Sequence, residues 1–243
     1  MSGRLVDFVI GGAQKCGTTA LWKALSEHPQ ICMSRQKEVH FFDQDRFFTS
    51  NDVAYDEYHK HFLLTPDHRR IGEATPIYLF WRPCAGRIVE YNPAMRWILL
   101  LRNPVDRAYS HFMMSRALGS TNLSLEEVIE KEQKLLPGVQ DRVYSCLSRG
   151  MYSEQLERLF ALFPKEQVLV LKSDDLRHDQ NVLPRIFNFL EVDAYPGATV
   201  QEIHRGNYEE ITEESRRRLS QYFVHELEKL EVLLQWNLSD WKL

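Results

Sequence analysis

The chain has 243 residues, with 30 Lys and Arg against 34 Asp and Glu, so its formal net charge is −4. Hydrophobic residues make up 44% of it, and a chain of this size can bury a core without disulfides or metals. These values exclude a disordered, collagen-like or coiled-coil protein. The mild negative charge gives no general electrostatic reason to bind nucleic acid or an anionic membrane surface, so an anionic ligand requires a local basic cleft.

The cysteines and the amino end restrict the class of protein further. The 4 cysteines are far apart, with no CxxC pair and no His and Cys cluster at zinc spacing, so we expect no metal site. The apolar run Val6–Ile10 is short and leads into glycines, unlike a signal peptide. No run approaches the ~20 apolar residues of a membrane-spanning helix. We therefore expect a soluble, cytoplasmic protein with reduced thiols.

Apolar runs of strand length alternate with stretches of helical period, which predicts repeated βα units. In chain order, the expected strands are 6–12, 30–33, 70–74, 95–101 and 168–171, and the expected helices are 18–25, 103–119, 124–134, 152–163, 182–190 and 212–234. The clearest strand is Met95–Leu101, whose last residues carry no polar group, as in a strand covered on both faces. The pattern predicts an α/β fold of three layers, with a central, mainly parallel β-sheet flanked by helices.

The chain shows no internal repeat and no low-complexity segment. We therefore expect a single domain over residues 1–243. Two loop-rich stretches, 42–70 and 195–208, are interpreted as lids or ligand-facing insertions rather than as linkers.

The first expected strand leads into the loop Gly12-Ala13-Gln14-Lys15-Cys16-Gly17-Thr18-Thr19, which opens a helix. Such a loop directs backbone N–H groups and the positive end of the helix dipole toward one point, which favours phosphate or sulfate. It is not a Walker A loop, because Thr18 stands where GxxxxGK[ST] requires lysine. The lysine of this loop is Lys15, which precedes Gly17 by two residues. Arg102 follows a strand where a magnesium-binding acid is expected, which indicates an anionic ligand handled without metal. A plain βα turn is the alternative.

The stretch Ile10–Leu21 resembles the phosphosulfate-binding loop of sulfotransferases, especially the heparan sulfate N- and 3-O-sulfotransferase branch. Leu101–Ser110 resembles that family's strand-to-helix segment, and further similarity covers 147–164 and 167–176. The resemblance implies a P-loop-like fold and a metal-independent sulfotransferase that uses 3′-phosphoadenosine 5′-phosphosulfate (PAPS) and releases adenosine 3′,5′-bisphosphate (PAP). It implies two groups of donor-binding residues: Lys15, Cys16, Gly17, Thr18 and Thr19 at the phosphosulfate, and Arg102 and Ser110 at the 3′-phosphate.

The run Lys37–Phe42 resembles the Glu-Val-His-Phe-Phe stretch of the 3-O-sulfotransferases. The resemblance implies three catalytic residues. Glu38 takes the proton of the acceptor, Lys15 neutralises the bridging oxygen of the leaving group, and His40 orients the carboxylate or the acceptor. Each residue alone has an ordinary alternative, because a Glu beside a Lys is usually a solvated pair and a His among apolar residues is usually structural.

Two further segments bear on the resemblance. The branch often carries a lysine in a Glu-Lys-Thr/Ser-Pro run, whereas this chain has Glu73-Ala74-Thr75-Pro76. Either the acceptor is less acidic than a glycosaminoglycan or another basic residue compensates, and Glu73 is either a second carboxylate in the cleft or a structural residue. The run 203–208 resembles a loop that closes over the nucleotide, which implies four more donor-binding residues: Arg205, Gly206, Asn207 and Tyr208. An ordinary loop is the alternative.

The resemblance implies in-line sulfuryl transfer to a hydroxyl or amine of a small-molecule or saccharide-type acceptor. Six aromatic residues either line the acceptor site or belong to the core: Phe41, Phe42, Tyr55, Tyr58, Tyr78 and Trp81. The alternatives are a P-loop nucleotide kinase or NTPase, disfavoured by the displaced Lys15, and a non-catalytic nucleotide-binding module, disfavoured by Glu38. The lack of a signal or anchor favours a bacterial enzyme over a Golgi-lumen one, and the sequence leaves the oligomeric state open.

Overall fold

The computed structural model describes residues 3–49, 52–135, 139–200 and 209–242. The chain forms two compact units, each built from two segments. Residues 1–101 and 158–203 form the sheet unit, and residues 102–157 and 204–243 form the helical unit. The single domain expected over residues 1–243 stays a prediction.

The sheet unit is built on a five-stranded parallel sheet in the order β2-β3-β1-β4-β5. Its strands are β1 (Phe8–Gly12), β2 (Ile31–Met33), β3 (Arg70–Ala74), β4 (Arg96–Leu101) and β5 (Val168–Lys172). Each lies within two residues of the range expected from the sequence. The central strands β1 and β4 are buried almost throughout because helices cover both faces of the sheet. The predicted α/β fold with a parallel central sheet is confirmed.

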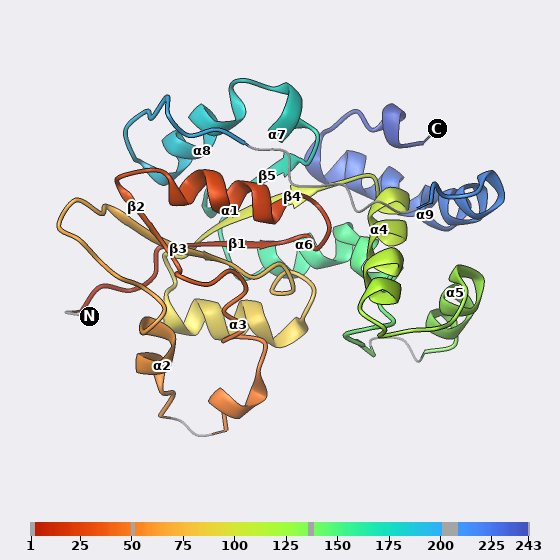
Figure 1. Cartoon of the computed structure of the whole chain (residues 1–243), viewed down its shortest axis with the longest axis horizontal. Coiled ribbons are helices and arrows are strands. Elements are labelled where there is room, and N and C mark those ends of the chain that lie inside the picture. The colour runs from red at the N-terminus through yellow and green to blue at the C-terminus, as the bar shows by residue number, and fades with distance from the viewer. Residues whose placement is uncertain (1–2, 50–51, 136–138, 201–208, 243) are drawn as a thin grey trace. The chain divides into compact units, whose positions relative to one another are not determined.

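Helices connect these strands, and Figure 1 shows α1 and α8 on one side of the sheet and α3 on the other. The helices and 3₁₀ turns of this unit are α1 (Thr18–Ser26), η1 (Asp45–Phe47), α2 (Tyr55–His59), α3 (Arg82–Tyr91), η3 (Lys165–Gln167), α7 (Asp175–His178) and α8 (Val182–Leu190). The sequence analysis missed α3. Its signals are Pro83 in the first turn and buried Cys84, Ile88 and Tyr91 at helical spacing.

The segment 42–70, expected to be a lid or a ligand-facing insertion, also contributes to the core. Tyr58 of α2 is fully buried, and its ring packs against Phe41 and Phe42 with centroids 5.0 Å away from each. Tyr78 is buried in the same cluster. Although the loop is polar in composition, each of these rings removes a large apolar area from water when it is buried, and this favours their place in the core. Four of the six aromatic residues considered for the acceptor site, Phe41, Phe42, Tyr58 and Tyr78, are therefore core residues.

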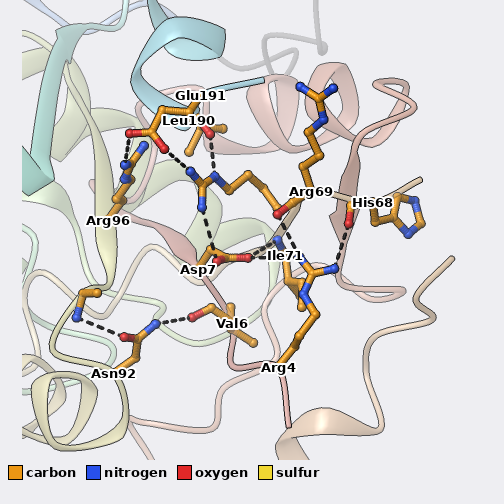
Figure 2. A network of polar contacts seen from close by, with 12 residues as sticks. Arg4, Val6, Asp7, His68, Arg69, Ile71, Asn92, Arg96, Leu190 and Glu191 are labelled. Atoms are coloured by element: carbon orange, nitrogen blue, oxygen red, sulfur yellow. Dashed lines mark hydrogen bonds and ion pairs between the residues drawn. The ribbon is translucent and has the colours of Figure 1, made fainter. Parts of the chain in front are cut away.

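Charged side chains form a network of polar contacts at the edge of the sheet where the strands begin (Figure 2). Asp7 accepts a hydrogen bond from the Ile71 N–H at 2.7 Å and lies 3.6 Å from the Arg70 guanidinium. Glu191, which follows α8, pairs with both Arg70 and Arg96. Burial raises the pKa of Asp7, although its hydrogen bond from Ile71 and the charge of Arg70 oppose that shift. This network links the starts of β1, β3 and β4 to the end of α8. A functional site is therefore expected at the opposite edge, where the strands end.

The helical unit contains α4 (Pro104–Ala117), α5 (Leu125–Gln133), η2 (Ser148–Gly150), most of α6 (Tyr152–Phe160), α9 (Glu213–Leu234) and η4 (Ser239–Trp241). A capping box begins α5, since the side chains of Ser124 and Glu127 each bond the other's backbone N–H. Phe112 of α4, Val128 of α5 and Phe223 of α9 are buried in one apolar cluster. The ends of these helices agree with the sequence expectation within about one turn, α6 being three residues shorter at its end.

Candidate functional site

The loop after β1 has the geometry of an anion site. The Ala13 N–H binds the Leu100 carbonyl at 2.8 Å, which fixes the loop to the neighbouring strand β4. Gly17 precedes α1 with φ at 93°, a left-handed conformation that favours glycine. No side chain caps α1 and its first turn holds no acidic residue. The N–H groups and the positive dipole of this turn are therefore suited to a bound anion.

Lys15 lies within this loop and is half-buried. Its φ is 71°, a left-handed value that is uncommon outside glycine and that recurs at functional sites. Cys16 and Thr18 are buried, whereas Gly17 is exposed and Thr19 is half-buried. The structure thus brings together the five residues predicted to bind the phosphosulfate, on one turn at the carboxyl end of β1.

Glu38 lies beside the next strand at the same edge of the sheet. Its backbone N–H binds the Ala74 carbonyl at 2.9 Å, at the end of β3. In the register of the sheet Ala74 is paired with Ile10, two residues before the phosphate loop begins. Because β1 and β3 are parallel neighbours, their carboxyl ends place Lys15 and Glu38 at one edge, as expected for a ligand site in an α/β sheet.

Glu38 belongs to a row of charged side chains formed by Lys37, Glu38, His40 and Asp43. Lys37 forms an ion pair with one carboxylate oxygen of Glu38. His40 Nε2 lies 3.3 Å from the other oxygen, and His40 Nδ1 lies 3.0 Å from Asp43 Oδ2. The Glu38 side chain is 37% exposed, whereas that of Asp43 is 0% exposed. The imidazole of His40 is therefore held between a carboxylate that solvent can reach and one that it cannot.

These contacts set the charge states of the row. Burial alone would raise the pKa of Glu38, but the hydrogen bond from His40 and the charge of Lys37 together lower it to about 2. The hydrogen bond to Asp43, followed by the one to Glu38, raises the pKa of His40 to about 9. Near neutral pH, Glu38 is consequently a carboxylate and His40 an imidazolium. The sequence analysis did not identify Asp43, whose signal was only its spacing of three from His40.

The main chain of this segment is held in sparsely populated conformations. Glu38 has φ at 62° and His40 has φ at 54°, both left-handed and both on residues with full side chains. Such conformations persist only where surrounding contacts fix them, and they cluster at functional sites. This strain supports a functional interpretation of the segment over an ordinary solvated surface pair.

The remaining predicted donor residues belong to the helical unit or lie outside the described residues. Arg102 and Ser110 belong to the helical unit, where the Arg102 guanidinium is 4.0 Å from Asp106 and Ser110 is buried in α4. The Arg102 carbonyl accepts a hydrogen bond from the Tyr152 hydroxyl at 3.0 Å. The four residues predicted in the nucleotide loop, Arg205, Gly206, Asn207 and Tyr208, lie outside the described residues.

Within the described ranges, no three His, Cys, Asp or Glu side chains gather as a metal ion would require. No helix in those ranges has the length and apolar character needed to cross a membrane.

Comparison with known proteins identifies sulfotransferases among the relatives of this chain. A family model described as "Sulfotransferase domain" matches residues 5–231. The human bifunctional heparan sulfate N-deacetylase/N-sulfotransferase 3 is 28% identical over 227 residues, covering 88% of this chain and 26% of the relative. The human heparan sulfate glucosamine 3-O-sulfotransferase 3B1 is 29% identical over 190 residues, covering 78% of this chain and 47% of the relative. The chain thus spans about a quarter to a half of the length of these two proteins.

Solved structures agree with this result. A sulfotransferase from Alicyclobacillus acidocaldarius superposes with a TM-score of 0.82 and 29% identity, covering 99% of this chain and 100% of that one. The mouse sulfotransferase SULT7A1, solved in complex with PAP, has a TM-score of 0.60 at 17% identity, covers 93% of this chain and 86% of that one, and supports the fold alone. These matches confirm the sequence resemblance, the P-loop-like fold that it implied and the expectation of an enzyme.

Proposed function

The chain belongs to the sulfotransferase family, and on that premise we propose that it transfers the sulfuryl group of PAPS to a hydroxyl or amine of a saccharide-type or other small acceptor. PAPS is the donor that this family uses. The observation that carries the proposal is the position of Glu38 at the end of β3, beside the strand that leads into the Lys15 loop. A basic anion loop and an ionised carboxylate are the two groups that sulfuryl transfer requires.

We assign the chemical roles as follows. Glu38 takes the proton of the acceptor as its oxygen or nitrogen bonds to sulfur, while the bond between sulfur and the bridging phosphate oxygen breaks. Lys15 and the first turn of α1 stabilise the charge that develops on the departing PAP. His40 holds Glu38 in the ionised form that a base requires, but at its pKa of about 9 the imidazolium also weakens that base. Arg102 and Ser110 remain our proposed ligands of the 3′-phosphate, on the strength of the family resemblance.

The acceptor side offers one structural clue. A hollow of about 430 Å³ in the sheet unit is lined by Arg35, Gln36, Lys60 and His61. Arg35 and Gln36 precede Glu38 by three and two residues, so the hollow lies on the segment that carries the base. Its lining is basic, which suits an acceptor with an anionic substituent such as an acidic saccharide. The cytoplasmic location expected from the sequence stays a prediction.

The test of the proposal separates binding from turnover. PAP binding is measured by calorimetry without magnesium, and sulfuryl transfer from PAPS is measured by mass gain on a panel of probes: a de-N-sulfated heparin oligosaccharide, a phenol and a lipid alcohol. Glu38→Gln should leave the Kd for PAP within about twofold while lowering kcat at least a hundredfold, as expected on losing a general base. Glu90→Gln, an exposed carboxylate of α3, is the matched control. Unchanged turnover in Glu38→Gln refutes its assignment as the base.

The same binding and transfer measurements test the alternatives from the sequence. A P-loop kinase or NTPase should prefer ATP with magnesium over PAP. A non-catalytic module should bind PAP without transferring sulfate to any member of the panel.

A further inference from the structure

We propose that the buried carboxylate of Glu73 is a positioning residue that fixes the Glu38–Phe41 segment through the hydroxyls of Thr75 and Tyr78. This inference rests on the proposed function, because it assigns Glu73 a role in orienting the proposed base. It also decides between the two sequence interpretations of Glu73. With 0% exposure the residue faces no cleft, so it is not a second carboxylate at the substrate.

Three hydroxyl groups surround the Glu73 carboxylate. Tyr58 and Tyr78 both donate to Oε1 at 2.9 Å, and Thr75 donates to Oε2 at 2.6 Å. Burial raises the pKa of Glu73 to about 6, against the hydrogen bonds from Thr75, Tyr58 and Tyr78, which lower it. Above that pH the carboxylate can only accept hydrogen bonds, so it fixes the direction in which each hydroxyl points its proton.

The directed hydroxyls then bind the main chain that carries the proposed base. The Tyr78 hydroxyl accepts from the Phe41 N–H at 3.1 Å, and the Thr75 hydroxyl accepts from the His40 N–H at 3.5 Å. The Glu38 N–H binds the Ala74 carbonyl at 2.9 Å. The hydroxyls of Thr75 and Tyr78 each donate a hydrogen bond to Glu73 and accept one from a main-chain N–H of the segment, because a hydroxyl can be donor and acceptor at once.

The strain in the segment explains why such anchors are needed. Glu38 and His40 both adopt left-handed main-chain conformations that surrounding contacts must maintain. The anchors come from β3 and the turn after it, so they set the segment relative to the sheet edge where β1 leads into the Lys15 loop. A misplacement of about 1 Å in such a group can lower a rate a hundredfold. Glu73 can therefore control the rate without contacting substrate.

Tyr58 and Tyr78 provide a matched pair for the test. Both hydroxyls donate to the same Glu73 oxygen at 2.9 Å, and Tyr→Phe leaves either ring in the core. Of these two tyrosines, only Tyr78 also bonds the segment that carries the proposed base. Among the described residues no hydrogen bond joins the Tyr58 hydroxyl to residues 38–41. The measurements are amide hydrogen exchange at Phe41 and His40, the Kd for PAP, and kcat with PAPS and the de-N-sulfated heparin oligosaccharide.

In Tyr78→Phe we expect exchange at the Phe41 amide to accelerate at least tenfold and kcat to fall about tenfold, with the Kd for PAP unchanged within about twofold. In Tyr58→Phe, exchange at Phe41 and kcat should both stay within about twofold of the parent protein. Thr75→Val and Thr75→Ser form a second pair in which the serine, which keeps the hydroxyl, should restore exchange protection at His40. Glu73→Gln should raise exchange at both amides, because the amide no longer directs every hydroxyl.

Equal loss of kcat in the two tyrosine variants would overturn the inference, since Glu73 would then act only in general stability. Unchanged exchange at Phe41 in Tyr78→Phe would overturn it as well. The exchange measurements need neither donor nor acceptor, so a failure of the proposed function, seen as no turnover in the parent protein, is distinguishable from a failure of this assignment.

Discussion

The buried carboxylate of Asp43 controls the charge of His40, and its replacement tests the electrostatic account of the site. Asp43→Asn removes the largest contribution to the raised pKa of His40, the hydrogen bond from Nδ1 to Oδ2 at 3.0 Å. The pKa of His40 should then fall from about 9 toward its ordinary value of 6.5, held above it only by the contact with Glu38. At pH 8 this changes the protonated fraction from about 90% to as little as about 3%.

The loss of that charge acts on the proposed base. The hydrogen bond from His40 is the largest of the contacts that lower the pKa of Glu38 to about 2. Once His40 is neutral, only Lys37 still opposes the increase that burial causes in the pKa of Glu38, so the carboxylate becomes a stronger base. In the parent protein kcat/KM should therefore rise as the pH rises through about 9. In Asp43→Asn the same rise should occur near pH 7.

Two measurements check this prediction. Nuclear magnetic resonance of labelled histidines, with His40→Gln used to assign the signal, reports the pKa of His40 directly in both proteins. The pH profile of kcat/KM with PAPS reports its effect on turnover. If His40 titrates near pH 9 in Asp43→Asn as well, Asp43 does not hold its proton and the electrostatic account is wrong.

Two further predictions concern stability. Gly17→Ala should lower the free energy of unfolding by about 1 kcal/mol, because Gly17 has φ at 93°; Gly86→Ala, within α3 and with nothing near its added carbon, should raise it by about the same amount. Urea titrations of both variants decide this, and similar shifts in the two would contradict it. Glu73 binds its proton more tightly in the folded chain, so stability should be full below pH 4.5 and fall as the pH rises through 6, by about 2 kcal/mol in total. Glu73→Gln should remove that fall, and an identical pH dependence in the two proteins would show that Glu73 is not its source.

Much of the sheet unit follows from local features of the sequence. Trp97–Leu101 is an unbroken apolar run, and such a run in a chain of βα units forms a buried parallel strand whatever follows it. The phosphate loop is local in the same sense, because Gly17 before Thr18 both ends the turn and starts α1. Residues that are adjacent in the chain fix these features, so the sequence alone predicts them.

The surroundings of the proposed base depend on tertiary structure. Glu38 meets Ala74, and His40 meets Thr75, only because β2, which precedes them, pairs with β3 and brings together residues more than thirty positions apart. Nothing near Tyr58 in the chain distinguishes an acceptor-lining ring from a core ring, and its burial is decided by packing against Phe41 and Phe42. The sequence therefore determined which chemical groups are present and which strands carry them. The long-range hydrogen bonds and the exclusion of water, which set the direction and the charge of each group, arise only when the sheet has formed.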